Sequence, residues 1–247
     1  MTFTPEQREG LRAALIARAQ ADARITGAAL TGSASVGRQD RWSDIDLAFG
    51  IADGTPLAEP LADWTAHMER AHGAVHHLDV VSGPAIYRVF LLPSTLQVDL
   101  AFFPAAALVA KGETFRLLFG VHAGQAPAPP PTVAQLAGTG WLHALHARAC
   151  IRRGQGWRAE YMISAIRDTA LSLSCLRLGL PWTQARGVDA LPPEVAAPFA
   201  DALVRGLDAV ELHRAFRVAG ALLLEGVRAA DPGLHDRIAA TVTELMS

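Results

Sequence analysis

The stretch Gly32-Ser33-Ala34-Ser35-Val36-Gly37-Arg38-Gln39-Asp40-Arg41-Trp42-Ser43-Asp44-Ile45-Asp46-Leu47 decides how this chain is interpreted. Its last residues alternate carboxylate and apolar side chains. Residues two apart in an extended strand lie roughly 6.6–6.8 Å apart on the same face, so Asp44 and Asp46 project together while Ile45 and Leu47 face a core. Two carboxylates on one face favour a divalent cation. Oxygen ligands of this kind suit Mg²⁺ or Mn²⁺, which complete their coordination with water and substrate phosphates.

The first residues of the same stretch predict an anchor for those phosphates. Gly32 lets backbone N–H groups approach an anion closely, and Ser33 adds a hydroxyl donor. Further along, Asp99 alternates with Val98 and Leu100 in a predicted strand, and we interpret it as a third ligand. Three carboxylates allow two metal ions roughly 3.5–4 Å apart, which can orient a triphosphate for an in-line displacement. The residues therefore predict a site for a metal and a nucleotide.

Hydrophobic periodicity predicts an α+β fold in which a small mixed-sheet domain precedes an all-helical bundle. The Pro-rich segment 123–131 can form neither a helix interior nor a central strand, so we place the boundary there. This gives a domain at 1–122, a linker at 123–132 and a helical domain at 133–247. The first domain is predicted to hold helices 5–23 and 57–72, strands 27–31, 44–51 and 75–81, and a hairpin of 87–92 with 96–103. The second is predicted to hold helices 133–153, 158–178, 193–207, 209–230 and 233–246.

Composition excludes several other classes of protein. The 247 residues include 24 acidic and 22 basic side chains, and neither half has the positive excess of a duplex-binding domain, so a nucleic-acid partner is not expected. No apolar run approaches the roughly 20 residues of a membrane helix, so no membrane partner is expected either. Glu6, Arg8 and Glu9 fall within the first ten positions, where a secretory signal would be apolar, which favours a cytoplasmic protein. Cys150 and Cys175 are expected to be core thiols.

The order Gly-Ser, spacer, Ser-Asp-x-Asp and distal Asp resembles the nucleotidyltransferases of the polymerase-beta-like superfamily over about 27–103. The two-domain layout looks most like the antibiotic nucleotidyltransferases that adenylylate aminoglycosides or lincosamides. The resemblance implies that Gly32 and Ser33 bind nucleotide phosphates and that Ser43 supports the start of the strand within the nucleotide site. It also implies that the three aspartates hold magnesium, with ATP or another nucleoside triphosphate as co-substrate.

Two further residues enter through this resemblance. Many relatives carry Ala-Arg-Gly where this chain has Ser35-Val36-Gly37, so Arg38 or Arg41 would supply the cation for the triphosphate. In some antibiotic-modifying relatives a glutamate of the helical domain deprotonates the acceptor hydroxyl, and Glu160 is the candidate here. An equally weighted interpretation of Glu160 is a favourable interaction with a helix N-terminus.

Three functions of different classes follow. The first is metal-dependent transfer of a nucleoside monophosphate, AMP from ATP, to a hydroxyl of a small molecule such as an aminoglycoside or lincosamide, with release of pyrophosphate and a role in antibiotic resistance. The second keeps the chemistry but takes RNA or a protein side chain as acceptor, as in toxin–antitoxin pairs. The third is a regulatory module that binds nucleotide without turnover. A P-loop kinase is excluded because the only lysine, Lys111, follows no Gly-x-x-x-x-Gly.

Overall fold

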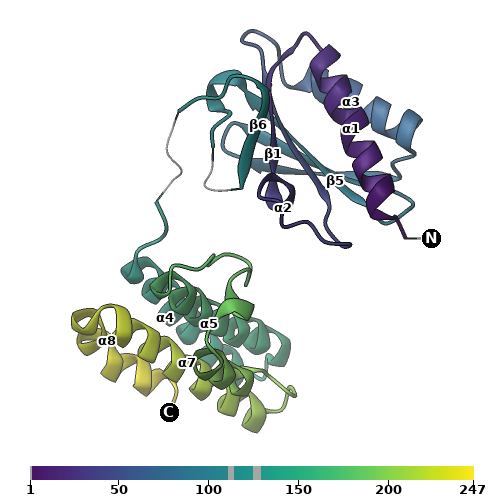
Figure 1. The fold of residues 1–247 in the computed structure, drawn as a ribbon. Helices are drawn as coiled ribbons and strands as arrows, with labels where there is room; N and C mark the ends of the chain where they lie inside the picture. Colours follow the sequence, from purple (N-terminus) through teal and green to yellow (C-terminus); the bar gives the residue numbers. More distant parts are fainter. Residues whose placement is uncertain (1, 111–113, 125–128) are drawn as a thin grey trace. The chain divides into compact units, whose positions relative to one another are not determined.

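A computed structural model describes residues 2–110, 114–124 and 129–247, which divide into two compact units, 1–128 and 129–247. The division falls inside the expected linker 123–132, of which 125–128 lie outside the described residues, as does Lys111. The first unit combines a mixed sheet with helices and the second is all-helical (Figure 1). The expected α+β fold class is therefore confirmed.

The first unit is built on a six-stranded sheet in the order β3-β4-β5-β2-β1-β6. Strands β2 and β5 are parallel and every other neighbouring pair is antiparallel. The elements of this unit are α1 (Pro5–Ala21), β1 (Ile25–Thr31), α2 (Gly32–Ser35), β2 (Ile45–Ile51), α3 (Ala58–His72), β3 (His76–Ser82), β4 (Ala85–Leu91), β5 (Gln97–Pro104) and β6 (Phe115–Gly120).

The two faces of this sheet are packed differently. On one face α1 and α3 lie side by side (Figure 1) and contribute Leu15 and Trp64 to a core with large strand residues such as Phe49 and Phe102. The rings of Trp64 and Phe49 lie 4.8 Å apart between centroids. The opposite face has a smaller cluster, built mainly from Ala29, Ala48, Ala85, Ala101, Phe103 and Leu108. Alternation along β2 and β5 thus sends bulky residues toward the helices and small or acidic residues to the other side.

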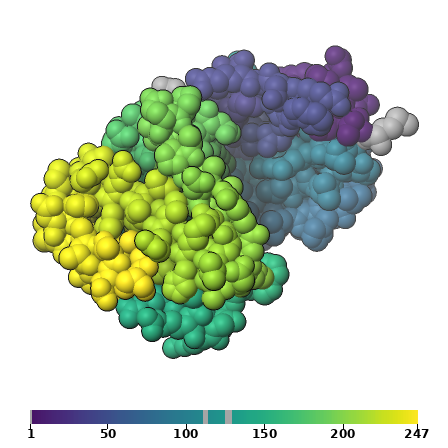
Figure 2. All heavy atoms as spheres, turned by 90° about the horizontal axis from the view of Figure 1, so that it is seen from below, coloured from purple at the N-terminus to yellow at the C-terminus, as the bar shows by residue number. Residues whose placement is uncertain are grey.

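The second unit is a bundle of α4 (Val133–Arg152), α5 (Gly156–Arg177), α7 (Ala209–Ala230) and α8 (Pro232–Leu245). Its core includes Cys150, and both cysteines are buried free thiols, as expected. Figure 2 shows α7 and α8, yellow-green to yellow, next to each other on one face of this unit. None of the helices in the described residues is both long and apolar enough to cross a bilayer.

Two expectations about the elements are wrong. The helix predicted over 193–207 is a single α-helical turn, α6 (Pro193–Ala196), followed by a 3-10 segment, η3 (Ala197–Ala202). Pro198 explains the change, because a proline lacks the N–H group that an α-helix interior needs. Strand β6 was not predicted. Its sequence, Phe-Arg-Leu-Leu-Phe-Gly, has no clean alternation, and its pairing with β1 joins segments far apart in the chain.

Candidate functional site

Three aspartates converge on the sheet face opposite α1 and α3. Asp46 of β2 lies directly beside Asp99 of β5 in the parallel register. Asp44 immediately precedes β2. One carboxylate oxygen from each of the three lies within 4.8 Å of the others, and all three residues are partly buried. No other group of three or more acidic, histidine or cysteine side chains that could hold a metal ion occurs in the described part of the chain.

Gly32 lies against this cluster, and any other residue at this position would displace the Asp46 carboxylate. Its φ of +61° is in the left-handed region, which side chains disfavour. A Cβ atom at this position would also collide with the Oδ2 atom of Asp46. The backbone at the start of α2 therefore approaches the Asp46 carboxylate more closely than a residue with a side chain could. This close approach joins the glycine-serine turn to the aspartates.

The loop that leads into Asp44 is fixed by hydrogen bonds. Ser43 donates its hydroxyl to the Oδ1 atom of Asp40 at 3.0 Å and accepts from the Asp40 backbone N–H at 2.9 Å. The Trp42 N–H also donates to Asp40, at 2.8 Å. The Trp42 N–H, the Ser43 hydroxyl and the charge of Arg8 lower the pKa of Asp40. Ser43 thus supports the start of β2 through Asp40.

Arg8 of α1 holds the same loop in place through hydrogen bonds. The sequence analysis did not identify this residue. Its side chain is 5% exposed, and its Nη1 atom donates to the backbone carbonyls of Asp40 at 2.6 Å and Ser43 at 3.0 Å. A buried guanidinium is costly unless its N–H groups are hydrogen-bonded, so these contacts tie the position of the loop to α1. An arginine in an amphipathic helix carries no local sign of such a role.

Gln97 is a second residue that the sequence analysis missed. Its amide Nε2 donates to Asp99 at 2.9 Å and lies 3.4 Å from Asp44. Gln97 and Asp99 are two residues apart on β5, so the same alternation that placed the aspartates on one face includes this glutamine. The amide therefore holds two of the three carboxylates in a shared orientation.

Burial raises the pKa of Asp99 to about 6, and the nearby negative charge of Asp44 adds to that effect against the Gln97 hydrogen bond, which lowers it. Crowded carboxylates of like charge are more stable when a cation neutralises them. The electrostatics of the cluster therefore favour a divalent ion.

The remaining predicted residues lie in two places. Ser33 is at the start of α2, and its carbonyl accepts a 3.0 Å hydrogen bond from the backbone N–H of Arg38, whose side chain is exposed. Glu160 is on α5 in the helical unit, where its carboxylate accepts a 2.7 Å hydrogen bond from Ser164. The structure thus gathers every predicted site residue except Glu160 in the sheet unit.

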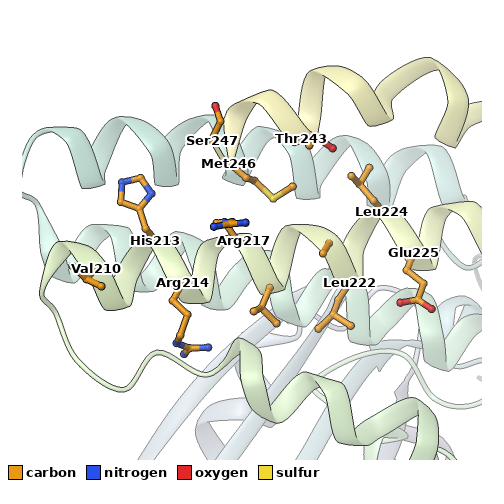
Figure 3. A pocket seen from close by; sticks show the side chains of 12 residues that line it. Val210, His213, Arg214, Arg217, Leu222, Leu224, Glu225, Thr243, Met246 and Ser247 are labelled. Atoms are coloured by element: carbon orange, nitrogen blue, oxygen red, sulfur yellow. The ribbon is translucent and has the colours of Figure 1, made fainter.

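A separate cavity of about 1190 Å³ lies between α7 and the end of α8 in the helical unit (Figure 3). Leu222, Leu224 and Met246 form much of its apolar lining, with Arg217 and His213 beside them. Glu225 is its only carboxylate side chain. Among the described residues, the cavity offers no group of three acidic, histidine or cysteine side chains that could hold a metal ion.

The glycine at the cluster gives a first prediction. Gly32→Ala should lower Mn²⁺ affinity by at least about tenfold in calorimetric titration, because the new Cβ displaces Asp46. Gly37→Ala is the matched control. Its φ of +68° imposes the same backbone strain, but a Cβ there meets nothing within 4 Å. Equal Mn²⁺ affinities in the two variants would contradict the steric argument.

The raised pKa of Asp99 gives a second prediction. The folded state keeps the Asp99 proton up to about pH 6, whereas the unfolded chain loses it near the ordinary aspartate pKa of 3.8, so stability falls as pH rises between these values. In EDTA, Asp99→Asn should therefore raise the free energy of unfolding at pH 7.5 by about 1–2 kcal/mol, a value discounted for partial solvent exposure. The gain should vanish near pH 4, as measured by urea unfolding.

Asp79→Asn is the control of opposite sign. The hydrogen bonds from Arg88 lower the pKa of Asp79, so stability is lost as pH falls, and the variant should be destabilised at pH 7.5. An Asp99→Asn variant that is less stable than the wild type at pH 7.5 in EDTA would show that burial is not the dominant influence on the pKa of Asp99.

Comparisons with known proteins find only distant likenesses. No family model matches the chain, and no curated protein does. An aminoglycoside 6-adenyltransferase from Bacillus subtilis is similar in structure, with 12% identity, coverage of 97% of each chain and a TM-score of 0.41. The polymerase core of TRAMP, an RNA surveillance complex, has 14% identity, coverage of 100% of this chain and 84% of that chain, and a TM-score of 0.33. These TM-scores are too low to carry an argument, so the interpretation of the site depends on its own geometry.

Proposed function

We propose that the protein is a metal-dependent nucleotidyltransferase that moves a nucleoside monophosphate, AMP from ATP, to a hydroxyl group of a small molecule and releases pyrophosphate. One observation carries this proposal: oxygens of Asp44, Asp46 and Asp99 lie within 4.8 Å of one another, and Gly32 makes a close backbone approach to them. A metal-bound triphosphate needs ligands for the metal and donors for the phosphates. The carboxylates supply the ligands, and the glycine turn supplies the backbone N–H donors.

The donor set fits magnesium or manganese, with room for one or two ions. All three ligands are hard carboxylate oxygens, which Mg²⁺ prefers over nitrogen or sulfur. Burial is the main cause of the raised pKa of Asp99 and the negative charge of Asp44 adds to it, and a bound cation would offset both effects. When bound, the metal would polarise phosphate oxygens and favour the ionised form of the attacking hydroxyl.

The residues of the chain then have distinct tasks. The backbone at Gly32 and Ser33 and the Ser33 hydroxyl bind the β and γ phosphates. Arg38 supplies the cation, because its backbone hydrogen bond to Ser33 keeps it next to this turn. Arg41 is the poorer candidate, since its guanidinium is stacked over the Trp42 ring at 4.7 Å.

The transfer step is an in-line displacement at the α-phosphorus. The acceptor oxygen forms a bond to this phosphorus while the bond to the oxygen bridging α and β breaks, and pyrophosphate leaves with that oxygen. The hydroxyl proton passes to a general base. Glu160 is our candidate, a half-buried carboxylate on α5 one turn from the exposed Trp157 and next to the exposed Tyr161. In this proposal the helical unit supplies the base and binds the acceptor.

Removal of one metal ligand provides the main test. Asp44→Ala and Asp46→Ala should each lower magnesium-dependent pyrophosphate release from ATP at least about a hundredfold, with circular dichroism unchanged. The assay uses a panel of aminoglycosides, lincosamides and other hydroxylated metabolites, with the product identified by its increase in mass.

Asp53→Ala is the matched control, since Asp53 is an exposed carboxylate in the turn after β2. Near-normal turnover in either ligand variant would show that the ligands are wrongly assigned. A wild-type protein that binds ATP but releases no pyrophosphate with any acceptor would instead indicate a regulatory module.

The general base has its own test. Glu160→Gln should lower the single-turnover rate about a hundredfold while ATP affinity stays the same, because the amide keeps a hydrogen-bond acceptor for Ser164 but cannot take a proton. The control is Glu194→Gln, at an exposed glutamate of α6. An unchanged rate for Glu160→Gln would exclude this residue as the base.

A further inference from the structure

A second charged cavity lies on the other side of the sheet unit. It has a volume of about 650 Å³, opens to the surface and is lined by the C-terminal half of α1, the α1–β1 turn and α3. Two guanidinium groups and two imidazole rings line it, against one carboxylate; the residues are Ala14, Arg18, Ala21, Asp22, Ala23, Arg24, His67 and His72. The cavity is therefore predominantly basic.

The one carboxylate is already neutralised. Asp22 accepts two hydrogen bonds of 2.9 Å from the guanidinium of Arg24 and one of 3.2 Å from the indole of Trp64. These contacts, led by those of Arg24, lower the pKa of Asp22 to about 2, so it stays ionised. Arg24 also donates to Asp63 at 2.7 Å. Arg24 and its two aspartates thus satisfy one another, and neither aspartate neutralises the other basic groups.

Arg18 has no acidic partner among the described residues. Its guanidinium lies over the ring of Trp64, with Cζ 5.0 Å from the centroid, and its buried Nε atom has no hydrogen-bond partner. An aromatic face orients a guanidinium without using its N–H groups, so these donors remain available for an anion. A buried donor without a partner costs free energy, which a hydrogen-bonding ligand would recover.

His72 on α3 repeats this pattern, with His67 beside it. The buried Nε2 atom of His72 also has no hydrogen-bond partner, and its ring lies 5.0 Å from that of His67. Burial lowers the pKa of both imidazoles, and for His67 the positive charges of Arg18, His72 and Arg70 add to the effect. An anion between these groups would offset the repulsion between them.

We propose that the cavity between α1 and α3 is a binding site for a small phosphate-type oxyanion, held by the Arg18 guanidinium and the imidazoles of His67 and His72. The ligand is either inorganic phosphate or the terminal phosphate of a nucleotide, since both offer the same oxygens to a planar guanidinium. The site is separate from the aspartate cluster. Asp22 and Arg24 precede β1, whereas Gly32 follows it, and α1 and α3 cover the sheet face opposite Asp46 and Asp99.

The test uses the full chain with EDTA present, so that binding through a metal at the aspartates does not contribute. Inorganic phosphate, pyrophosphate and AMP are titrated separately at pH 6.5, with sodium chloride at matched ionic strength. We expect phosphate or AMP to raise the thermal midpoint and to shift the Hε1 resonances of His67 and His72, while His143 of the helical unit does not move. A response to AMP alone would identify the ligand as the phosphate of a nucleotide. A response to inorganic phosphate would identify the ligand as the free ion.

Variants separate this site from general charge effects. Arg18→Gln should weaken the response at least about tenfold, because it removes the unpaired guanidinium. Arg228→Gln removes the same charge from an exposed position on α7 and should respond as the wild type. If Arg18→Gln folds poorly, His72→Gln provides the same comparison. Equal stabilisation by sodium chloride, or an unchanged response in both cavity variants, would overturn the proposal.

Discussion

The parallel, in-register pairing of β2 with β5 is the constraint on which the candidate site depends. It puts Asp46 directly beside Asp99, although 52 intervening residues separate them in the sequence. Parallel neighbours need a crossover, and here the segment containing α3, β3 and β4 provides it. A shift of one residue would turn Asp99 toward the helices and Leu100 toward the carboxylates. The packing of Val98, Leu100 and Phe102 in the core prevents that shift.

The loop before β2 supplies the rest of the site, and two contacts from outside it set its shape. Arg8 holds the carbonyls of Asp40 and Ser43, while Gly32 lets the first turn of α2 lie against Asp46. A buried guanidinium is costly unless it is hydrogen-bonded, and the left-handed backbone at Gly32 is free of strain only for glycine. Both features fix the loop and the first turn of α2 next to three crowded carboxylates.

The sheet separates two regions of opposite charge in this unit. The face with alanines and aspartates collects negative charge, whereas the cavity between α1 and α3 collects basic side chains, among them Arg18 and His72 with unpartnered nitrogen atoms. The large residues of β2 and β5 fill the core between them, so neither region can neutralise the other. The same alternation that positions the aspartates thus also isolates the second cavity from them.

The sequence by itself determined the local features of this protein. Alternation in Asp44-Ile45-Asp46-Leu47 and around Asp99 sufficed to put Asp46 and Asp99 on strands with apolar neighbours, and hydrophobic periodicity located the helix predicted over 5–23, which is α1. These are short-range patterns, which depend on backbone geometry alone. Pro198 is an equally local feature, and its missing N–H group interrupts the helix that hydrophobic periodicity predicts over 193–207.

Only the tertiary structure decided which distant groups meet. Arg8 and Asp40, Gln97 and Asp44, and Arg18 and Trp64 come from separate segments, and no spacing in the sequence links them. Strand β6 likewise forms because β1 offers it a free edge, since its own residues do not alternate. Strand register and helix packing bring such groups together, because the burial of apolar side chains elsewhere in the chain fixes both.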